Sequence, residues 1–361
     1  MKTFSSNYPE FAEILHEKMP CILATVIQTQ GSTPQKAGSS ALIGINQLLV
    51  GTVGGGITEL KVIQQAQTIL KSKKSGIFSF DLSGDLTKGS ESICGGGMTI
   101  LLDAAPELNL PVFNLLWNSL KQRTPGVLIT LIDESGPEEI KISRFWFSET
   151  NQPQLPTDSR NKIEPLIFEM LEQPNDTFSR LVSLKDLEIS TSGFVYLERI
   201  NPKPSLFIAG AGHIGQSLSR LGRFLDFEVT VWDDRPEYAD KTQVPDADFV
   251  LSGSIDTIAE KLDIQDDLYL VIVTHGHKCD ADVLRKFIGS DAAYIGMIGS
   301  KAKVSQMRMS FLENRWATPQ QWERVFTPVG LDIGAQTVEE IALSIAGQLI
   351  QIRNQRKKTG E

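Results

Sequence analysis

The stretch Leu206-Phe-Ile-Ala-Gly-Ala-Gly-His-Ile-Gly215 decides the fold of the C-terminal part of this chain. An apolar run typical of a buried strand leads into G-x-G-x-x-G, which opens an amphipathic helical pattern. Gly210 permits a tight turn, Gly212 lets the backbone approach a pyrophosphate, and Gly215 lets helix and strand pack closely. His213 stands inside the turn, where the helix N-terminus would offer N–H groups to phosphates. We predict a Rossmann-type nucleotide-binding unit.

A second strand, Glu228 to Trp232, ends in Asp233-Asp234-Arg235. Asp233 lies where an acidic residue meets a ribose 2′-hydroxyl in this fold, and Asp234 follows it. Arg235 leaves open whether a phosphorylated or an unphosphorylated dinucleotide would bind. Further strands alternate with helices as far as a capping box at Thr337-Val-Glu-Glu340, which opens the last helix. This alternation predicts a parallel sheet that is covered on both faces.

Three more loops follow strands or precede helices of the same sheet, so they should line the same crevice. Thr274–Asp280 contains two histidines, Gly296–Lys301 offers N–H groups and one ammonium to an anion, and Pro328–Gly334 precedes the last helix. The residues that we expect to contact a ligand there are His275, His277, Gly299, Ser300, Lys301 and Asp332.

The His275-Gly-His277 pair imitates the start of a binuclear metallohydrolase site, in which histidines bind zinc. The chain has four histidines in all, and the other two, His16 and His213, lie far upstream. We therefore expect no metal site. A crevice-lining role is favoured, and a purely structural capping role stays open.

Glycine clusters also mark the N-terminal part. Gly54, Gly55 and Gly56 stand just ahead of a helical pattern, where backbone N–H groups can hold an anion. Cys94 is followed by three glycines, which would leave its sulfur accessible as a reactive thiol requires. Cys21 lies in an apolar strand and is expected to be a small buried hydrophobe, with Cys279 intermediate between the two.

The predicted fold class is α/β, with a C-terminal Rossmann-like doubly wound parallel sheet and an N-terminal α+β domain. We place the domains at 1–105, at 106–204 and at 205–361. The middle segment should pack with the N-terminal domain, and it ends in the linker Asn201-Pro-Lys-Pro204.

Composition excludes several classes of protein. A net charge of -9 disfavours a nucleic-acid binder, which needs a basic face. No apolar stretch approaches the roughly 20 residues that span a bilayer, and the first ten residues lack the apolar core of a signal peptide. Three dispersed cysteines indicate reduced thiols in the cytoplasm and are too few for a four-cysteine iron–sulfur cluster. A homodimer is the default expectation for the assembly.

Taken together, these motifs resemble the XdhC/CoxI family, whose members mature molybdenum hydroxylases such as xanthine dehydrogenase. One local departure is Lys-Cys-Asp after His277, which leaves Cys279 as a second thiol near the crevice. The matching segments are Gly-Ser-Thr-Pro34, Gly54-Gly-Gly56 with Glu59, Cys94-Gly-Gly, Gly210–Gly215, Asp233-Asp-Arg-Pro236, Thr274–His277, Gly299–Lys301 and Gly330–Gly334.

The resemblance implies a chaperone that binds the molybdenum cofactor, as molybdopterin or its dinucleotide form. Such a protein promotes sulfuration of the cofactor with a cysteine desulfurase and hands it to an apo molybdenum hydroxylase. Cys94 would then contact the molybdenum or a transferred sulfur, because a thiolate is a soft ligand and nucleophile. The alternatives are an NAD(P)-dependent oxidoreductase, a catalytic subunit of the hydroxylase, and a Rossmann domain with a vestigial pocket.

Overall fold

The computed structural model describes residues 4–45, 47–81, 96–136, 140–172, 179–260, 262, 264 and 266–359. The chain folds as two compact units, one over Met1–Pro202 and the other over Lys203–Thr359. The division falls inside the segment Asn201–Pro204 that the sequence marks as a linker. The segment from 106 to Pro202 belongs to the first unit together with the N-terminal residues.

The first unit contains two antiparallel sheets. The first sheet has the strand order β3-β2-β1-β5-β4 and the second has the order β7-β6-β9-β8. The first sheet consists of β1 (Ile22–Gln30), β2 (Ser40–Ile43), β3 (Leu48–Gly51), β4 (Gly76–Asp81) and β5 (Gly97–Asp103). The second consists of β6 (Gly126–Asp133), β7 (Lys141–Ser148), β8 (Ser179–Ser183) and β9 (Gly193–Ile200).

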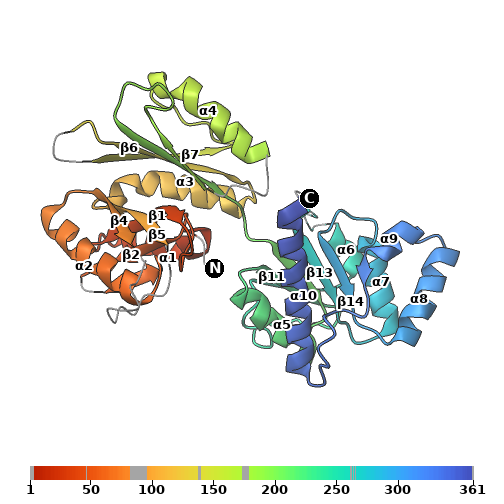
Figure 1. Cartoon of the computed structure of the whole chain (residues 1–361). Coiled ribbons are helices and arrows are strands. Elements are labelled where there is room, and N and C mark those ends of the chain that lie inside the picture. Colours follow the sequence, from red (N-terminus) through yellow and green to blue (C-terminus); the bar gives the residue numbers. More distant parts are fainter. Residues whose placement is uncertain are drawn as a thin grey trace. The chain divides into compact units, whose positions relative to one another are not determined.

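Helices separate and cover these sheets (Figure 1). Apolar side chains of α1 (Phe4–His16) and α3 (Leu110–Lys121), such as Phe11 and Phe113, share one core with residues of both sheets. Helix α2 (Gly56–Ser72) packs on the first sheet through Val62 and Ala66, in a separate core. Helix α4 (Thr157–Glu172) packs on the second sheet through Ile163 and Ile167. The unit is therefore a layered α+β structure.

A group of charged side chains lies inside this first unit. Arg144 on β7 donates a hydrogen bond to Asp103 on β5, and each side chain is only 3% exposed. Glu198 on β9 is also buried. Burial raises the pKa of the Glu198 carboxyl to about 8, although the charge of Arg144 opposes the shift. Arg144 thus joins two strands of different sheets, while burial favours the protonated form of Glu198.

The second unit has one sheet of six parallel strands, in the order β12-β11-β10-β13-β14-β15. Counted along the unit this is 3-2-1-4-5-6, the order of the dinucleotide-binding Rossmann fold. The strands are β10 (Ser205–Ala209), β11 (Glu228–Asp233), β12 (Phe249–Ser252), β13 (Leu268–Ile272), β14 (Tyr294–Met297) and β15 (Val325–Phe326).

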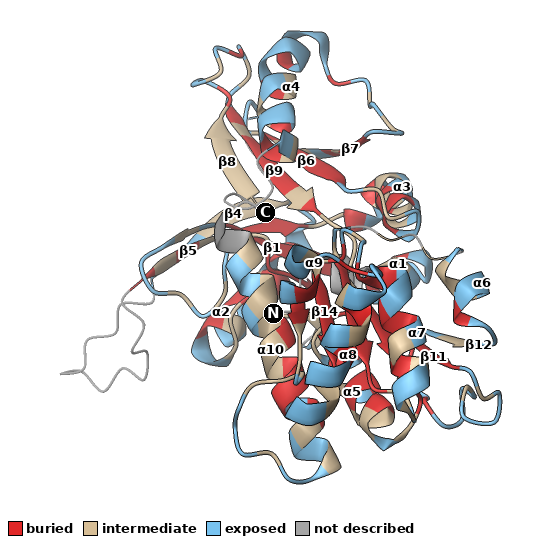
Figure 2. Cartoon of the chain, turned by 90° about the vertical axis from the view of Figure 1, so that its right-hand side faces the viewer, coloured by how far each residue is buried: buried red, intermediate tan, exposed pale blue. Residues whose placement is uncertain are grey.

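Helices cover both faces of this sheet. Helices α5 (His213–Phe224) and α10 (Val338–Thr359) pack together on one face. The other face carries α6 (Ile255–Ala259), α7 (His277–Phe287), α8 (Lys301–Glu313) and α9 (Pro319–Glu323). The helices bury the side that faces the sheet and expose the opposite side (Figure 2). The predicted fold class, a doubly wound Rossmann-like unit plus an N-terminal α+β unit, is confirmed. No described helix is both long and apolar enough to span a membrane.

Sequence reasoning missed several small elements. The strand β15 has two residues and the helix α9 has five, so neither shows a period. The strands β3 and β4 have four and six residues and lie at the two edges of their sheet. These elements are stabilised by tertiary contacts more than by local pattern.

Candidate functional site

The strand order of the second unit reverses at β10, which pairs with β11 on one side and with β13 on the other. In open parallel sheets, ligands bind outside the carboxyl ends of the strands at such a switch point. The turn Gly210–His213 follows β10, and the loop Thr274–Gly276 follows β13. The predicted glycine turn and the predicted histidine loop therefore flank the point where a ligand is expected.

The three glycines of the turn differ in what the fold requires of them. Gly210 has a φ of 125°, and a Cβ there would lie 2.4 Å from the Val273 carbonyl oxygen. A Cβ on Gly215 would lie 1.9 Å from the Gly210 carbonyl oxygen. Gly212 has an ordinary φ of -69°, and nothing lies within 4 Å of a Cβ built on it. The fold explains two of the glycines, whereas the third leaves open space at the start of α5.

Helix N-termini in this unit fall into two groups. Side chains of Ser254, Ser300, Thr318 and Thr337 accept a hydrogen bond from the first turns of α6, α8, α9 and α10. In contrast, α5 begins after Gly212 and α7 begins after Gly276, and neither has a side-chain cap. These two helices start beside the switch point. Their N–H groups and positive dipole ends can attract an anion.

Asp233 lies at the end of β11 and is 1% exposed. One carboxylate oxygen accepts hydrogen bonds from the Ala211 N–H (2.9 Å) and Arg235 Nη2 (3.0 Å). The other accepts from Arg235 N (3.1 Å) and Nε (2.9 Å). Burial disfavours ionisation, but the hydrogen bonds from Arg235 and Ala211 outweigh it and lower the pKa of the Asp233 carboxyl. A ribose could bind this carboxylate only by displacing one of these donors.

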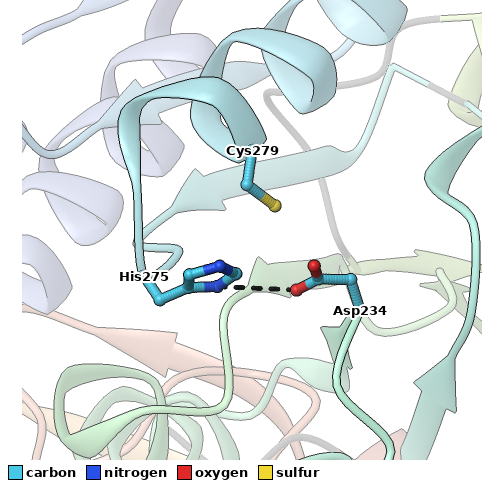
Figure 3. Close-up of side chains that lie close together, drawn as sticks. All are labelled: Asp234, His275 and Cys279. Carbon is cyan, nitrogen blue, oxygen red and sulfur yellow. Dashed lines mark ion pairs between the residues drawn. The ribbon is translucent and has the colours of Figure 1, made fainter.

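Asp234, the next residue, turns outward and meets the histidine loop. His275 Nδ1 lies 3.5 Å from Asp234 Oδ1, and both side chains are 43% exposed. Cys279, in the first turn of α7, directs its sulfur toward the same space (Figure 3). Burial raises the pKa of the Cys279 thiol to about 11, and the nearby Asp234 adds to the shift. The structure thus groups two predicted site residues with the extra thiol, while His277 is exposed at the start of α7.

A buried ion pair holds the histidine loop. Asp280 is fully buried and accepts hydrogen bonds from the Thr274 N–H (3.2 Å) and hydroxyl (2.6 Å). Lys303 on α8 donates to the other Asp280 oxygen. Sequence reasoning missed the positioning role of Asp280 and Lys303. An Asp in the first turn of a helix after a buried strand was the available signal, but its lysine partner is not local.

The other predicted residues of this unit lie farther from the switch point. Gly299, Ser300 and Lys301 follow β14, and Asp332 follows β15, the outermost strand on that side. The Ser300 hydroxyl accepts from the Lys303 N–H (3.3 Å), so it already caps α8. Lys301 and Asp332 are exposed. These residues share the carboxyl edge of the sheet without being grouped with Asp234 and His275.

The N-terminal candidates belong to the first unit. Gly54 and the N-cap residue Gly55 precede α2, Gly56 is its first residue, and this helix also lacks a side-chain cap. Glu59 in its first turn accepts a hydrogen bond from the Thr52 hydroxyl (2.9 Å), which fixes the glycine loop to the helix. Cys94 lies outside the described residues, so its predicted role stays a prediction. Cys21 lies directly before β1 and is buried, and burial raises the pKa of its thiol to about 11.

Comparison with known proteins gives matches in both units. The XdhC Rossmann domain matches residues 206–349, and the XdhC and CoxI family model matches residues 14–81. A Bacillus subtilis protein, named as a probable subunit of xanthine dehydrogenase, is 24% identical over 348 residues, which cover 94% of this chain and 95% of that protein. "Uncharacterized protein YqeB" of Escherichia coli is 22% identical over 96% of this chain and 46% of its own length.

A solved structure supports the same assignment. The crystal structure of a protein named as a xanthine dehydrogenase, from Bacillus halodurans, superimposes with a TM-score of 0.75 and 25% identity over 98% of each chain. The similarity therefore extends over both units rather than over the Rossmann unit alone. With both domains of the family matched in order, the chain belongs to the XdhC and CoxI family.

Proposed function

We propose that this chain binds the molybdenum cofactor as its cargo and assists its sulfuration and insertion into an enzyme of the xanthine dehydrogenase type. Family membership and the names of the relatives support the coarser statement, a role in the maturation of such an enzyme. The observation that carries the finer statement is the pair of uncapped helix N-termini, α5 and α7, at the switch point.

The chemistry of this place fits the phosphate end of the pterin cofactor, or the diphosphate of its dinucleotide form. Two helix ends supply N–H donors and partial positive charge without a competing side chain. Gly212 leaves space for a ligand to approach the start of α5, because no atom lies within 4 Å of a Cβ built on it. The residues present therefore fit an anionic group, and in this proposal they bind and orient the cargo.

An NAD(P)-dependent oxidoreductase is the main alternative. A ribose needs a free carboxylate at the end of the second strand, and Asp233 already accepts four hydrogen bonds from the protein. The sequence also lacks a Tyr-x-x-x-Lys pair that could handle a proton during hydride transfer. The name "xanthine dehydrogenase" borne by two relatives does not make this chain a catalytic subunit, since three cysteines cannot hold a four-cysteine cluster.

Cys94 is the residue proposed to contact the molybdenum or a transferred sulfur. The remaining proposed partners are a cysteine desulfurase and an apo molybdenum hydroxylase, with a homodimer as the assembly. The proposal thus assigns phosphate binding to the uncapped starts of α5 and α7, and contact with the molybdenum or a transferred sulfur to Cys94.

Equilibrium binding of molybdenum cofactor to the purified full chain tests the proposal. We expect submicromolar binding that Gly212→Ala weakens about tenfold, or about 1.4 kcal/mol. The new methyl group has room in the fold but occupies the approach of the ligand. Gly289→Ala is the control, because Gly289 lies between α7 and β14, at the amino ends of the strands. A Cβ there would meet only the side-chain nitrogen of Gln321 (3.3 Å), and affinity should stay unchanged.

Cys94→Ser should also weaken binding of the cofactor or abolish its sulfuration. Tight NAD(P)H binding with hydride transfer that is insensitive to Cys94→Ser would overturn the proposal. If the wild type and Gly212→Ala bind the molybdenum cofactor with equal affinity, the start of α5 does not bind the cofactor.

A further inference from the structure

We propose that Asp234, His275 and Cys279 bind a divalent transition-metal ion of the Zn²⁺ type. One potential ligand atom from each side chain lies within 4.8 Å of the other two. The three residues, hereafter the Asp-His-Cys cluster, come from the loop after β11, the loop after β13 and the first turn of α7. Figure 3 shows the carboxylate, the imidazole and the sulfur pointing toward one common space.

The donor set selects the class of metal. Thiolate sulfur, imidazole nitrogen and a single carboxylate oxygen suit Zn²⁺ and similar borderline ions, whereas Ca²⁺ and Mg²⁺ prefer several oxygen ligands. Tetrahedral zinc places its ligand atoms about 3.3–3.8 Å apart, so the atoms of the cluster must approach one another by at most about 1.5 Å. His275 and Asp234 are each 43% exposed, which keeps a fourth coordination position accessible to water or to another ligand.

Buried neighbours hold the ligands in place. Asp233, directly before Asp234, is fixed by its hydrogen bonds with Ala211 and Arg235. Asp280, directly after Cys279, is fixed by Thr274 and Lys303. Each ligand is therefore attached to backbone that a buried carboxylate anchors. Such prior ordering of the supporting residues is what a tight metal site requires.

The ion would add positive charge to the carboxyl edge of the sheet. Gly276, the N-cap of α7, directly follows His275. The Ala211 N–H in the glycine turn donates a hydrogen bond to Asp233, which directly precedes Asp234. A bound dication would also favour the thiolate form of Cys279 over the thiol. The inference does not rest on the proposed function, because the cluster would bind a metal whether or not a pterin binds nearby.

Titration of the metal-free full chain with Co²⁺, followed by competition with Zn²⁺, tests this inference. Cobalt bound to a thiolate gives a sulfur-to-metal charge-transfer band, and the cluster should give this band at one equivalent. We expect Cys279→Ser to abolish the band, and His275→Gln and Asp234→Asn each to weaken affinity at least about tenfold. His277→Gln is the matched control, since this neighbouring exposed histidine is outside the cluster, and it should leave affinity unchanged.

Alkylation of the wild-type protein gives a measurement that depends on no variant. Iodoacetamide labelling of Cys279, read on its peptide by mass spectrometry, should slow at least about tenfold when Zn²⁺ is added, because the ion occupies the sulfur lone pair. Persistence of the cobalt band in Cys279→Ser would place the metal at another thiol and overturn the inference. Unchanged labelling of Cys279 in the presence of Zn²⁺, or equal losses in His277→Gln and His275→Gln, would do the same.

Discussion

Both units bury carboxylates, but at different places. In the first unit, Asp103 and Glu198 lie inside the protein together with Arg144, and the carboxylate of Asp103 is satisfied there. In the second unit, Asp233 is the last residue of β11 and Asp280 lies in the first turn of α7; both are buried, and Asp234 beside Asp233 is exposed. Buried charge in the first unit therefore connects its layers. In the second unit it fixes the loops that carry the candidate site.

The largest effect is expected from breaking the buried pair of the first unit. Arg144→Met leaves Asp103 buried without its partner, which should lower the free energy of unfolding by about 3–5 kcal/mol. Denaturant unfolding followed by hydrogen exchange in β6 and β9 measures the loss in this unit. Arg180→Gln is the control: its ion pair with Glu169 is exposed, so the change should stay within about 1 kcal/mol.

If Arg144→Met costs no more than the exposed control, the buried charges do not connect the layers of the first unit. In that case the contrast between the two units disappears.

The pH dependence of stability should come next in size. The pKa of Glu198 is raised from its ordinary value of 4.5 to about 8 in the folded protein. The folded state therefore keeps a proton that the unfolded chain releases, and stability falls as pH rises between these two values. The slope should reach about 1.4 kcal/mol per pH unit.

Urea unfolding of the wild type and Glu198→Gln at several pH values between 5 and about 8 isolates this contribution. Other groups titrate in both proteins and cancel in the difference. The stability of the wild type relative to Glu198→Gln should therefore decline as the pH rises through this range. Parallel curves for the two proteins would show that Glu198 is ionised in the folded state at neutral pH.

The Rossmann unit was predictable because its signals are local. The glycine turn at Gly210–Gly215 and the alternation of strands and helices are written in consecutive residues. The rule that ligands bind at the carboxyl ends of parallel strands then placed His275 and Asp234 on the same edge. The capping box at Thr337 and Glu340 was equally local, and the structure shows both of its hydrogen bonds (3.2 and 3.1 Å).

Pairings between distant residues were not predictable. The position of Asp233 indicates a ribose contact, but spacing alone cannot tell that Ala211 and Arg235 occupy its oxygens. Cys279 is separated from Asp234 by three elements of secondary structure, so their proximity follows only from the order of the strands. Arg144 stands in a strand with an exposed lysine at its start, and nothing in that pattern shows its burial.

The smallest effects concern the helix ends, and they sharpen the comparison most. Thr337→Ala removes the cap of α10 and should cost about 1 kcal/mol of unfolding free energy. Gly212→Ser adds a cap to α5, since the φ of -69° and ψ of -175° are already those of an N-cap residue. This change should stabilise the unit by a few tenths of a kcal/mol.

The two cap substitutions should differ in their effect on ligand binding. The serine hydroxyl of Gly212→Ser would take an N–H group that an anion needs, so inorganic phosphate and the molybdenum cofactor should bind less tightly. Thr337→Ala should leave that binding unchanged, because α10 starts after β15 and away from the switch point. If Gly212→Ser makes the protein more stable but weakens anion binding, the uncapped start of α5 serves ligand binding at a cost in stability. If Gly212→Ser gains stability and binds the anion as before, the open end of α5 has no such role.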